Sequence, residues 1–371
     1  MTNTNNLPLA NTNNLPLAER TNIKDWEFEK LTLKEISTTS VNGDEHKPEN
    51  AKNYVVIGDG VVVSKNLEDG ITLKEAANYK GLSNSLITLN NEKSNSKISL
   101  KIAKNKNIKE PIYISYVALE RSLVHQTEIT LEESSSANIV ETFKSDKALN
   151  MNILSKVNVL DNANLNSSVI NNLNGENVIY YHRLTEVNRD ATLDSSNFIL
   201  NDSNLVFEDF THLVGKGSEA DVKTVAISDK SQKQNITVRI ENLAPHSNGN
   251  IINYGVVKDN AHLAFNGIGK IHKGMNAGDN QQESRLLNLS KTAEAIANPF
   301  LLIDEGDITA GHAASIGQID EEQVYYLMSR GMPKIEAEKL IVKGFLTPFA
   351  NSVGDEGLRE ALLKNIEEKL G

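Results

Sequence analysis

The 371-residue sequence predicts a mainly β protein built on a stacked β-solenoid. From about residue 110 to residue 300, short runs rich in Ile, Val, Leu and Thr are each bounded by Asn, Asp, Gly or Ser, which is typical of strands and turns. Hairpin signals are scarce in this stretch, because Asn-Gly occurs there only at 174–175, 248–249 and 266–267. Many strands with few tight hairpins favour coils over a meander.

A weak internal repeat favours the same fold. A polar or small residue, an alanine, a polar residue and an apolar residue recur in this order, with the alanines at Ala137, Ala163, Ala191, Ala220 and Ala261. The first four are 26 to 29 residues apart, and a period of 25–30 residues suggests the coils of a solenoid. The last gap of 41 residues requires an insertion, for which residues 243–250 are the candidate. A β-sandwich in which the motif recurs by chance remains the alternative at this point.

The chain before the solenoid divides into two parts. Residues 3–10 and 11–18 are the same eight residues, NTNNLPLA, and their prolines oppose a helix, so residues 1–20 are expected to be a disordered leader. Residues 21–105, which include Trp26, alternate short apolar runs with polar turns. They are expected to form a small mixed or helical N-terminal domain.

After a β-helix core over residues 106–308, a helical C-terminal domain is expected over residues 309–371. Asp320 with Gln323 resembles a capping box at a helix start, and Gly331 and Pro333 separate this helix from the next. A third helix is expected near 355–370. Apolar stripes at helical spacing are Val324, Tyr325, Leu327 and Met328 in the first helix, Ala337, Leu340, Ile341 and Phe345 in the second, and Leu358, Ala361, Leu362 and Ile366 in the third.

Composition excludes several classes of function. The chain has no cysteine, which excludes disulfides, thiolate metal sites and cysteine nucleophiles supplied by this chain. Its 38 Lys and Arg against 49 Asp and Glu argue against nucleic-acid binding, which rests on basic patches. No apolar run approaches the roughly 18 residues of a membrane helix, and no secretory signal opens the chain. We therefore expect a cytoplasmic protein with neither nucleic acid nor membrane as partner.

Catalytic motifs are absent or incomplete. Gly215-Lys216-Gly217-Ser218 lacks the spacing and the following helix of a phosphate-binding loop, and Gly267-Ile268-Gly269 lacks the third glycine of a dinucleotide fingerprint. Parallel β-helices also host carbohydrate-active enzymes, which use clustered carboxylates. An enzyme or adhesin of this kind is the alternative function, with carboxylates from Asp190, Asp194, Asp202, Glu208 and Asp209.

Two groups of histidines have an interesting context. His246, His262 and His272 lie in consecutive predicted strands and could converge, although spacing alone does not show it. His312 lies in Gly311-His312-Ala313-Ala314, where small neighbours leave the imidazole accessible. A neutral imidazole is a good metal ligand, but a structural histidine remains the alternative.

A longer pattern is more specific than any of these motifs. The string GHAASIGQIDEEQVYYLMSRG covers residues 311–331, and a stretch with Gln281, Gln282, Leu286, Leu287 and Ser290 precedes it. With these residues the chain resembles the SufB/SufD family of iron–sulfur cluster assembly proteins over roughly residues 20–350. The resemblance implies a right-handed parallel β-helix. It also implies a complex with a SufB-like paralogue, paired through the β-helices, and with two copies of the ATPase SufC, docked on the C-terminal helices.

The resemblance also implies roles for single residues. Cysteines that receive sulfur or ligate the cluster are a feature of the SufB branch, so this chain is expected in the other branch, as a non-enzymatic scaffold. A functional histidine at the SufB interface matches His312, while Ala310 replaces a cysteine that some relatives have two residues earlier. No cofactor is expected on the chain alone; iron or a nascent cluster would be shared at the interface.

The ATPase-docking surface is expected on the exposed sides of residues 323–330 and 334–345. We choose Tyr325, Tyr326 and Arg330 as its anchors, because Tyr and Arg are enriched in binding hot spots. For Tyr326 a simple core position is the alternative. Without its paralogue, the chain is expected to form a homodimer through the β-helix.

Overall fold

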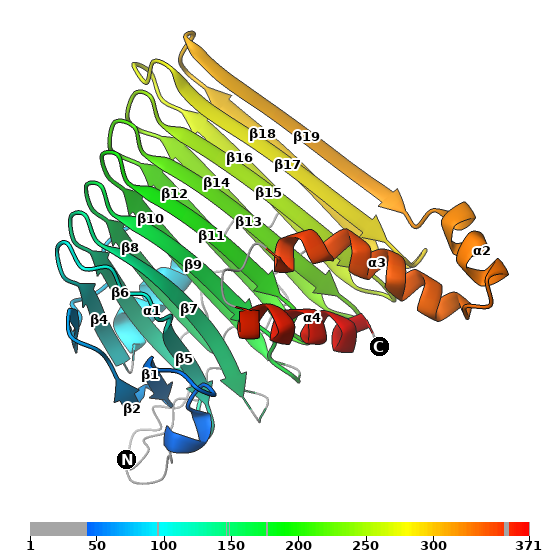
Figure 1. The fold of residues 1–371 in the computed structure, drawn as a ribbon, viewed down its shortest axis with the longest axis horizontal. Helices are drawn as coiled ribbons and strands as arrows, with labels where there is room; N and C mark the ends of the chain where they lie inside the picture. Colours follow the sequence, from blue (N-terminus) through cyan, green and yellow to red (C-terminus); the bar gives the residue numbers. More distant parts are fainter. Residues whose placement is uncertain are drawn as a thin grey trace.

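The structure, a computed structural model, describes residues 43–94, 96–145, 147, 149–175, 177–351 and 356–370. In these residues the chain forms two facing sheets, with consecutive strands of the solenoid alternating between them (Figure 1). The odd sheet has the strand order β19-β17-β15-β13-β11-β9-β7-β5-β1-β2, and the even sheet has the order β18-β16-β14-β12-β10-β8-β6-β4-β3. Among the described strands, the pairs β1–β2 and β3–β4 are antiparallel, and all other pairs are parallel. This topology confirms the solenoid over the sandwich.

The elements have the following bounds. The odd sheet contains β1 (Asn53–Gly58), β2 (Val61–Asn66), β5 (Ile112–Ala118), β7 (Ser136–Ser145), β9 (Asn164–Asn171), β11 (Thr192–Ile199), β13 (Glu219–Ser228), β15 (Asn248–Val257), β17 (Gly278–Asn288) and β19 (Ile308–Gln318). The even sheet contains β3 (Ile71–Glu75), β4 (Ser96–Ile102), β6 (Leu123–Leu131), β8 (Met151–Val159), β10 (Val178–Val187), β12 (Asn204–Leu213), β14 (Lys233–Asn242), β16 (His262–Ile271) and β18 (Glu294–Ile303). The helices are a 3-10 turn (Gly43–His46), α1 (Ser85–Lys93), α2 (Glu321–Ser329), α3 (Lys334–Ala350) and α4 (Glu356–Leu370).

From β5 to β17, each odd strand is preceded by a corner residue with left-handed backbone. These corner residues are Asn105, Ser134, Asn162, Asp190, Gly217, His246 and Ala277, with φ between 53° and 71°. Asn, Asp and Gly adopt this conformation most readily, which explains why Asn suits so many turns of this chain. Residues in register in the odd sheet, such as Asn164, Thr192 and Glu219, are 28 and 27 positions apart, in agreement with the predicted period.

The alanine repeat is only partly a repeat of equivalent positions. Ala163 and Ala191 are buried directly after a left-handed corner residue, but Ala137 and Ala220 lie inside strands, in register with Leu165 and Leu193. Ala261 precedes the even strand β16, at the opposite corner. The insertion predicted at residues 243–250 was therefore wrong: the 41-residue gap runs from a position inside β13 to the corner before β16, and residues 243–247 form an ordinary connection between β14 and β15.

The two sheets extend beyond the predicted boundaries of the core. Strands β1 to β4 belong to the same two sheets, although residues 21–105 were assigned to a separate mixed domain. At the other end, β19 continues to Gln318, past the predicted end of the core at residue 308. The prediction ended too early because the Ala and Gly residues of this strand have a low strand propensity. The predicted leader over 1–20, its repeat and Trp26 lie outside the described residues.

The space between the sheets holds the largest apolar cluster, which runs from Val55 to Ala293. A charged group interrupts it near the middle. Arg183 on β10 is 1% exposed; its Nε donates to Asp209 Oδ1 at 2.9 Å, and its guanidinium also donates to Ser195 Oγ at 2.6 Å and Asn197 Oδ1 at 3.0 Å. Nearby Glu141 accepts hydrogen bonds from Tyr116 and Tyr181, and burial raises the pKa of its carboxyl group.

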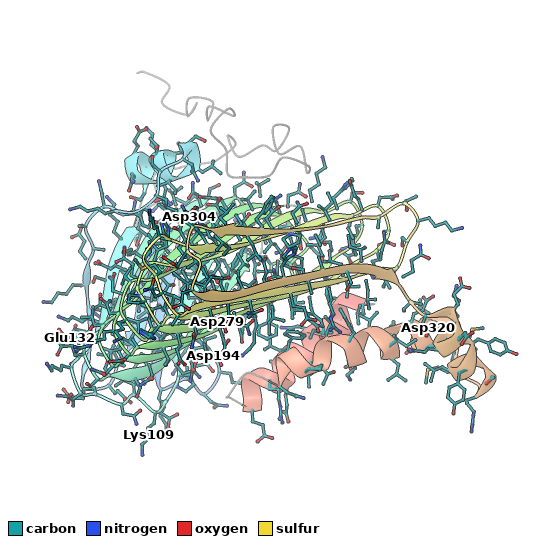
Figure 2. All side chains as sticks on the ribbon, turned by 90° about the horizontal axis from the view of Figure 1, so that it is seen from above. Lys109, Glu132, Asp194, Asp279, Asp304 and Asp320 are labelled. Carbon is teal, nitrogen blue, oxygen red and sulfur yellow. The ribbon has the colours of Figure 1, made fainter. Side chains whose placement is uncertain are left out.

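Both outer faces are partly covered. Helix α1 lies on the even sheet, where a second polar network links Tyr79 Oη to His182 Nε2 at 2.8 Å and His182 Nδ1 to Glu208 at 2.9 Å. Helices α3 and α4 lie along the odd sheet, as Figure 2 shows, with Val342, Leu346 and Ile366 packed onto its outer residues. Among the described residues no helix is long and apolar enough to cross a membrane.

The C-terminal helices match the predicted positions but not all of the predicted faces. Asp320 caps α2 by accepting from the backbone N–H groups of Glu322 and Gln323. In α3, Ala337 is buried and Phe345 is partly buried against the odd sheet, as predicted, whereas Leu340 is 47% exposed. Its buried residues are Ala337, Val342, Leu346, Phe349 and Ala350, so the prediction was wrong for Leu340. In α4 Leu362 and Ile366 are buried as predicted, whereas Ala361 is exposed.

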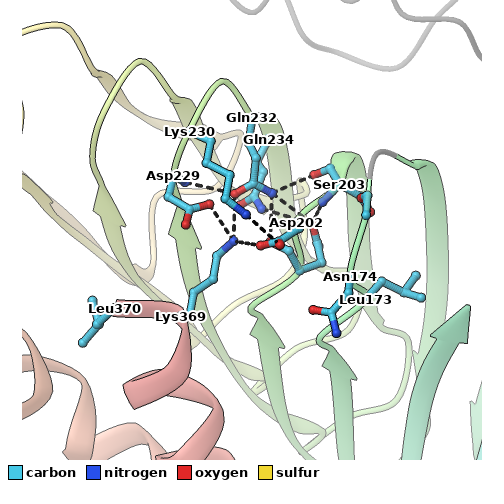
Figure 3. A network of polar contacts seen from close by, with 12 residues as sticks. Leu173, Asn174, Asp202, Ser203, Asp229, Lys230, Gln232, Gln234, Lys369 and Leu370 are labelled. Atoms are coloured by element: carbon cyan, nitrogen blue, oxygen red, sulfur yellow. Dashed lines mark hydrogen bonds and ion pairs between the residues drawn. The ribbon is translucent and has the colours of Figure 1, made fainter. Parts of the chain in front are cut away.

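A buried lysine fixes the end of α4 to the corners of the solenoid (Figure 3). Lys369 Nζ contacts Asp202 Oδ1 at 2.5 Å, Asp229 Oδ1 at 2.7 Å and Gln232 Oε1 at 3.0 Å, and the lysine side chain is 5% exposed. Asp202 and Asp229 come from two successive connections between an odd and an even strand. Burial alone would raise the pKa of Asp202, but the hydrogen bonds from Lys369 and Lys230 outweigh it and hold the pKa below its ordinary value.

We predict that Arg183→Met lowers the free energy of unfolding by about 3–5 kcal/mol, because it leaves Asp209 buried without its cation. Denaturant unfolding followed by circular dichroism measures this loss. The control is Arg189→Met, which removes an exposed arginine that pairs with Asp161 at 2.9 Å and should cost about 1 kcal/mol or less. Equal losses in the two variants would contradict the role of the buried pair.

We predict that Lys369→Met speeds amide hydrogen exchange in α4 by about tenfold or more, because a buried carboxylate without its partner costs about 1–3 kcal/mol. Exchange in β9 should stay unchanged. Lys364→Met is the matched control, since Lys364 lies on the same helix and its side chain is 75% exposed.

The same contact should depend on pH. Because the pKa of Asp202 is lowered in the folded state, its contribution is present above the ordinary carboxyl pKa of about 3.9 and is lost as the pH falls below it. The protection factors of the amides in wild-type α4, which correct for the intrinsic pH dependence of exchange, should therefore fall at low pH, and Lys369→Met should show less of this fall. A constant ratio of the two rates across this range would count against the contact.

Candidate functional site

The last coil of the solenoid is open. Within the part of the chain that the structure describes, β18 and β19 each pair with a preceding strand on one side only and form the edges of their sheets. Three large apolar side chains are exposed there, namely Phe300 (42%), Leu302 (48%) and Ile316 (49%). Exposed edges and apolar groups of this kind mark surfaces that bind another protein chain.

His312 lies on the open edge strand β19. It is in register with Gln282 on β17, and Gln282 is in register with Ile251 on β15. Since Ile251 belongs to the core between the sheets, this row faces the inside of the solenoid, and His312 continues it on the uncapped coil. The imidazole is exposed, as the small neighbours predicted. The side chain is therefore available to a partner that covers the open end.

The other histidines do not converge. His246 is a corner residue, and His262 Nδ1 contacts Glu294 at 2.7 Å. His272 Nε2 instead contacts Glu241 at 2.6 Å, and Glu241 also lies 3.7 Å from His212. Burial lowers the pKa of His212. No group of three or more His, Asp or Glu that could hold a metal ion occurs within the part of the chain that the structure describes.

Helix α2 presents the three residues predicted as docking anchors. Tyr325 is 74% exposed and Tyr326 is 56% exposed, so a core position for Tyr326 was the wrong alternative. The Arg330 guanidinium lies 5.3 Å from the centre of the Tyr326 ring, and its Nη2 donates to Tyr326 Oη at 3.3 Å. The three residues thus form an exposed aromatic and cationic group on α2. This helix begins directly after Asp320, beyond the end of strand β19 (Figure 2).

A groove of about 440 Å³ separates α2 from the solenoid. Its walls include Val324, Tyr325 and Met328 from α2, Leu289 after β17 and Ile319 after β19. Lys291, Lys334, Glu321 and Glu338 add charged groups at the same groove. Apolar walls with charged neighbours suit a protein segment better than a small polar ligand.

The carboxylates of the alternative enzyme do not share one face. Glu208 and Asp209 are adjacent on β12 and point to opposite sides of the sheet, where Glu208 bonds to His182 and Asp209 to Arg183. Asp202 is paired with Lys369, and Asp194 Oδ1 lies 3.0 Å from Lys223 on the odd sheet. Gly215-Lys216-Gly217-Ser218 forms the corner before β13 rather than a phosphate-binding loop.

Sequence reasoning missed the apolar residues around the open end. Phe300, Leu302 and Ile316 lie in ordinary strand patterns, and their exposure follows only from the absence of a further coil among the described residues. Gln282 appeared only as part of a family pattern, yet it is the register neighbour of His312. In the structure, burial alternates along β17, so that Gln282 faces inward and Gln281 faces outward.

Comparison with known proteins identifies a family and relatives for this chain. Residues 115–345 match the family described as "SUF system FeS cluster assembly, SufBD core domain". The chain is 40% identical, over 73% of its length, to the "Iron-sulfur cluster assembly protein SufD" of Bacillus subtilis, and 27% identical, over 65% of its length, to the protein of the same name from Escherichia coli. These matches cover 63% and 58% of the two relatives.

The resemblance to the SufB/SufD family is thus confirmed. Both relatives are named SufD, which is the branch that the absence of cysteine predicted. The family match spans the strands from β5 to β19, the open end with His312, helix α2 and most of α3. Since it covers more than half of the chain, the chain belongs to the SufBD family of the SUF system.

Proposed function

We propose that this protein is a cytoplasmic, non-enzymatic scaffold subunit for iron–sulfur cluster assembly. A SufB-like paralogue covers the open end of the solenoid, and a SufC-like ABC ATPase docks on the C-terminal helices. The observation that carries this proposal is the family match, whose last residues include the exposed strand β19 and helix α2.

The open end supports the pairing with a paralogue. A second solenoid that placed its own edge strands against β18 and β19 would satisfy their unpaired backbone groups and cover Phe300, Leu302 and Ile316. His312 would then lie at the junction, with its imidazole available to iron or to a nascent cluster. The remaining ligands would come from the partner, because this chain contains no cysteine.

Helix α2 supports the docking of the ATPase. Tyr325, Tyr326 and Arg330 are residue types that dominate binding energies at interfaces, and the groove beside them can receive an apolar segment. The docking helices are in turn packed on the odd sheet through α3 and α4. These contacts would transmit a movement of the ATPase to the solenoid.

We predict that His312→Ala abolishes cluster formation in the reconstituted complex while the fold persists. The loss should be at least the roughly 10–100-fold that removal of an outer-shell partner costs at metal sites. Absorbance of the assembled cluster and iron content measure it, and thermal unfolding checks the fold. Ser315→Ala, on the same exposed strand, is the control. Normal cluster formation by His312→Ala would contradict the ligand role.

We predict that Tyr325→Ala weakens binding of the ATPase about 30-fold, because a hot-spot residue contributes about 2 kcal/mol or more. Calorimetric titration of the ATPase into the chain measures this change. Glu360→Ala, at an exposed position of α4, should bind as the wild type does. Unchanged affinity of Tyr325→Ala, with weaker binding of Glu360→Ala, would place the docking surface on α4 instead.

A further inference from the structure

The two edge strands of the open coil differ in how well they are protected against pairing with another strand. β19 is 11 residues long and contains neither a proline nor a charged residue. β18 contains Glu294 and, near its centre, Pro299. Both strands lie at the end of the solenoid opposite β1 and β2 (Figure 1). Because free N–H and C=O groups attract other strands, proteins protect edges with prolines, charges or a covering element. β18 carries such protection and β19 does not.

The missing N–H of Pro299 belongs to the open edge of β18. Successive residues of a strand direct their backbone groups to opposite edges, so residues two apart share one edge. The N–H of Glu294, at the start of β18, donates to the carbonyl of Ala261 at 2.9 Å. The N–H of Asp304, directly after β18, donates to the carbonyl of Ile271 at 2.9 Å. Even-numbered residues of β18 therefore face β16, and odd-numbered residues face the open edge. Pro299 leaves this edge without a donor near its centre.

β19, in contrast, has an unbroken row of N–H and C=O groups at its open edge. On β17, the N–H of Asp279 donates to the carbonyl of Ser247 at 2.9 Å, so odd-numbered residues of β17 face β15 and even-numbered residues face β19. In a parallel pair, only one residue of each register pair directs its backbone at the other strand. His312 is in register with Gln282, and its N–H and C=O therefore point to the open edge. The same direction holds for Ala310, Ala314 and Ile316.

The side chains of β19 also permit close approach of a further strand. Ala310 and Ala314 flank His312 in the row whose backbone faces the edge, and none of the three is buried. On β18 the exposed side chains are the bulky Phe300 and Leu302, which are even-numbered and alternate with the edge-facing residues. β18 is thus suited to side-chain contacts, and β19 is suited to backbone pairing.

We propose that an edge strand of the SufB-like partner pairs with β19 alone, so that the odd sheet continues across the interface and the even sheet is interrupted at Pro299. This inference rests on the proposed function, from which it takes the partner, and it narrows the pairing from two edges to one. A strand is the occupant because its evenly spaced N–H and C=O groups match those of β19. β18 contributes Phe300 and Leu302 as side-chain contacts.

The asymmetry determines how His312 is held at the junction. Its backbone becomes part of a hydrogen-bonded ladder with the partner. Gln282, which lies in the same row, donates to the carbonyl of Phe300 at 2.8 Å across the interior. Pro299 and the interruption of the even sheet therefore lie opposite the row of His312. The imidazole is fixed from one side and faces an unpaired strand on the other.

Hydrogen exchange of single amides, in the full chain alone and in its complex with the SufB-like partner, tests this pairing. Binding should slow exchange at the edge-facing amides of β19 by about tenfold or more, because each gains a ladder hydrogen bond. The edge-facing amides of β18 should keep their rates. The amides compared are Ala310, His312, Ala314 and Ile316 on β19, and Ala295, Ala297 and Leu301 on β18. Equal protection of both strands, or protection of β18 alone, would overturn the proposal.

Two proline substitutions form a matched pair for a binding experiment. Ala314→Pro removes one edge-facing N–H from β19, and Ala297→Pro removes one from β18. Neither N–H faces a neighbouring strand of this chain, so both variants should keep the fold, which thermal unfolding checks. Ala314→Pro should weaken binding of the partner about tenfold or more, whereas Ala297→Pro should bind as the wild type does. Equal losses of affinity would contradict pairing through β19 alone.

The outcomes separate this inference from the proposed function. If the partner does not bind the chain, the proposed pairing fails and this inference fails with it. If His312→Ala stops cluster formation while both edge strands gain equal protection, the proposed function stands and the asymmetric pairing is wrong. If only β19 gains protection while His312→Ala assembles clusters normally, the asymmetric pairing stands and the ligand role of His312 fails.

Discussion

The in-register stacking of parallel strands is the constraint on which the rest of this structure depends. Each odd strand places its inward residues directly above those of the strand before it, so that Ile251, Gln282 and His312 form one row. This row carries a core residue, a buried amide and an exposed imidazole in three successive coils. The position of His312 thus follows from the stacking, and its exposure follows from the end of the stack among the described residues.

The interior combines apolar layers with polar groups that are satisfied to different degrees. Arg183 is enclosed by Asp209 and by hydroxyl and amide acceptors, so its burial is compensated by direct bonds. Near the open end, Asn280 donates to Asn242 and Ile240, and Gln282 donates to the Phe300 carbonyl across the interior. Polar side chains thus occur both in the middle of the interior and at its open end.

Local signals were sufficient for the coils and the helix ends, but not for contacts between distant residues. Corner residues such as Asn162 and Asp190 revealed the period, and Asp320 revealed the start of α2. The same local pattern misplaced Ala261, because both corners of a coil favour small residues, and it misjudged Leu340, because the buried face of α3 is set by the sheet beneath it. The site itself was predicted at His312 and on α2, whereas its apolar surroundings depend on which residues the stacking exposes.

The attachment of α4 at Lys369 has a consequence for how such a chain can change in evolution. The segment after β19 returns along the odd sheet and is fixed at the corners that follow β11 and β13. The combined length of α3 and α4 must therefore match the distance from those corners to the open end. A coil inserted within this span would separate Lys369 from Asp202 and Asp229, while a coil added before β11 would leave the attachment intact. Variation in solenoid length should accordingly accumulate on the N-terminal side.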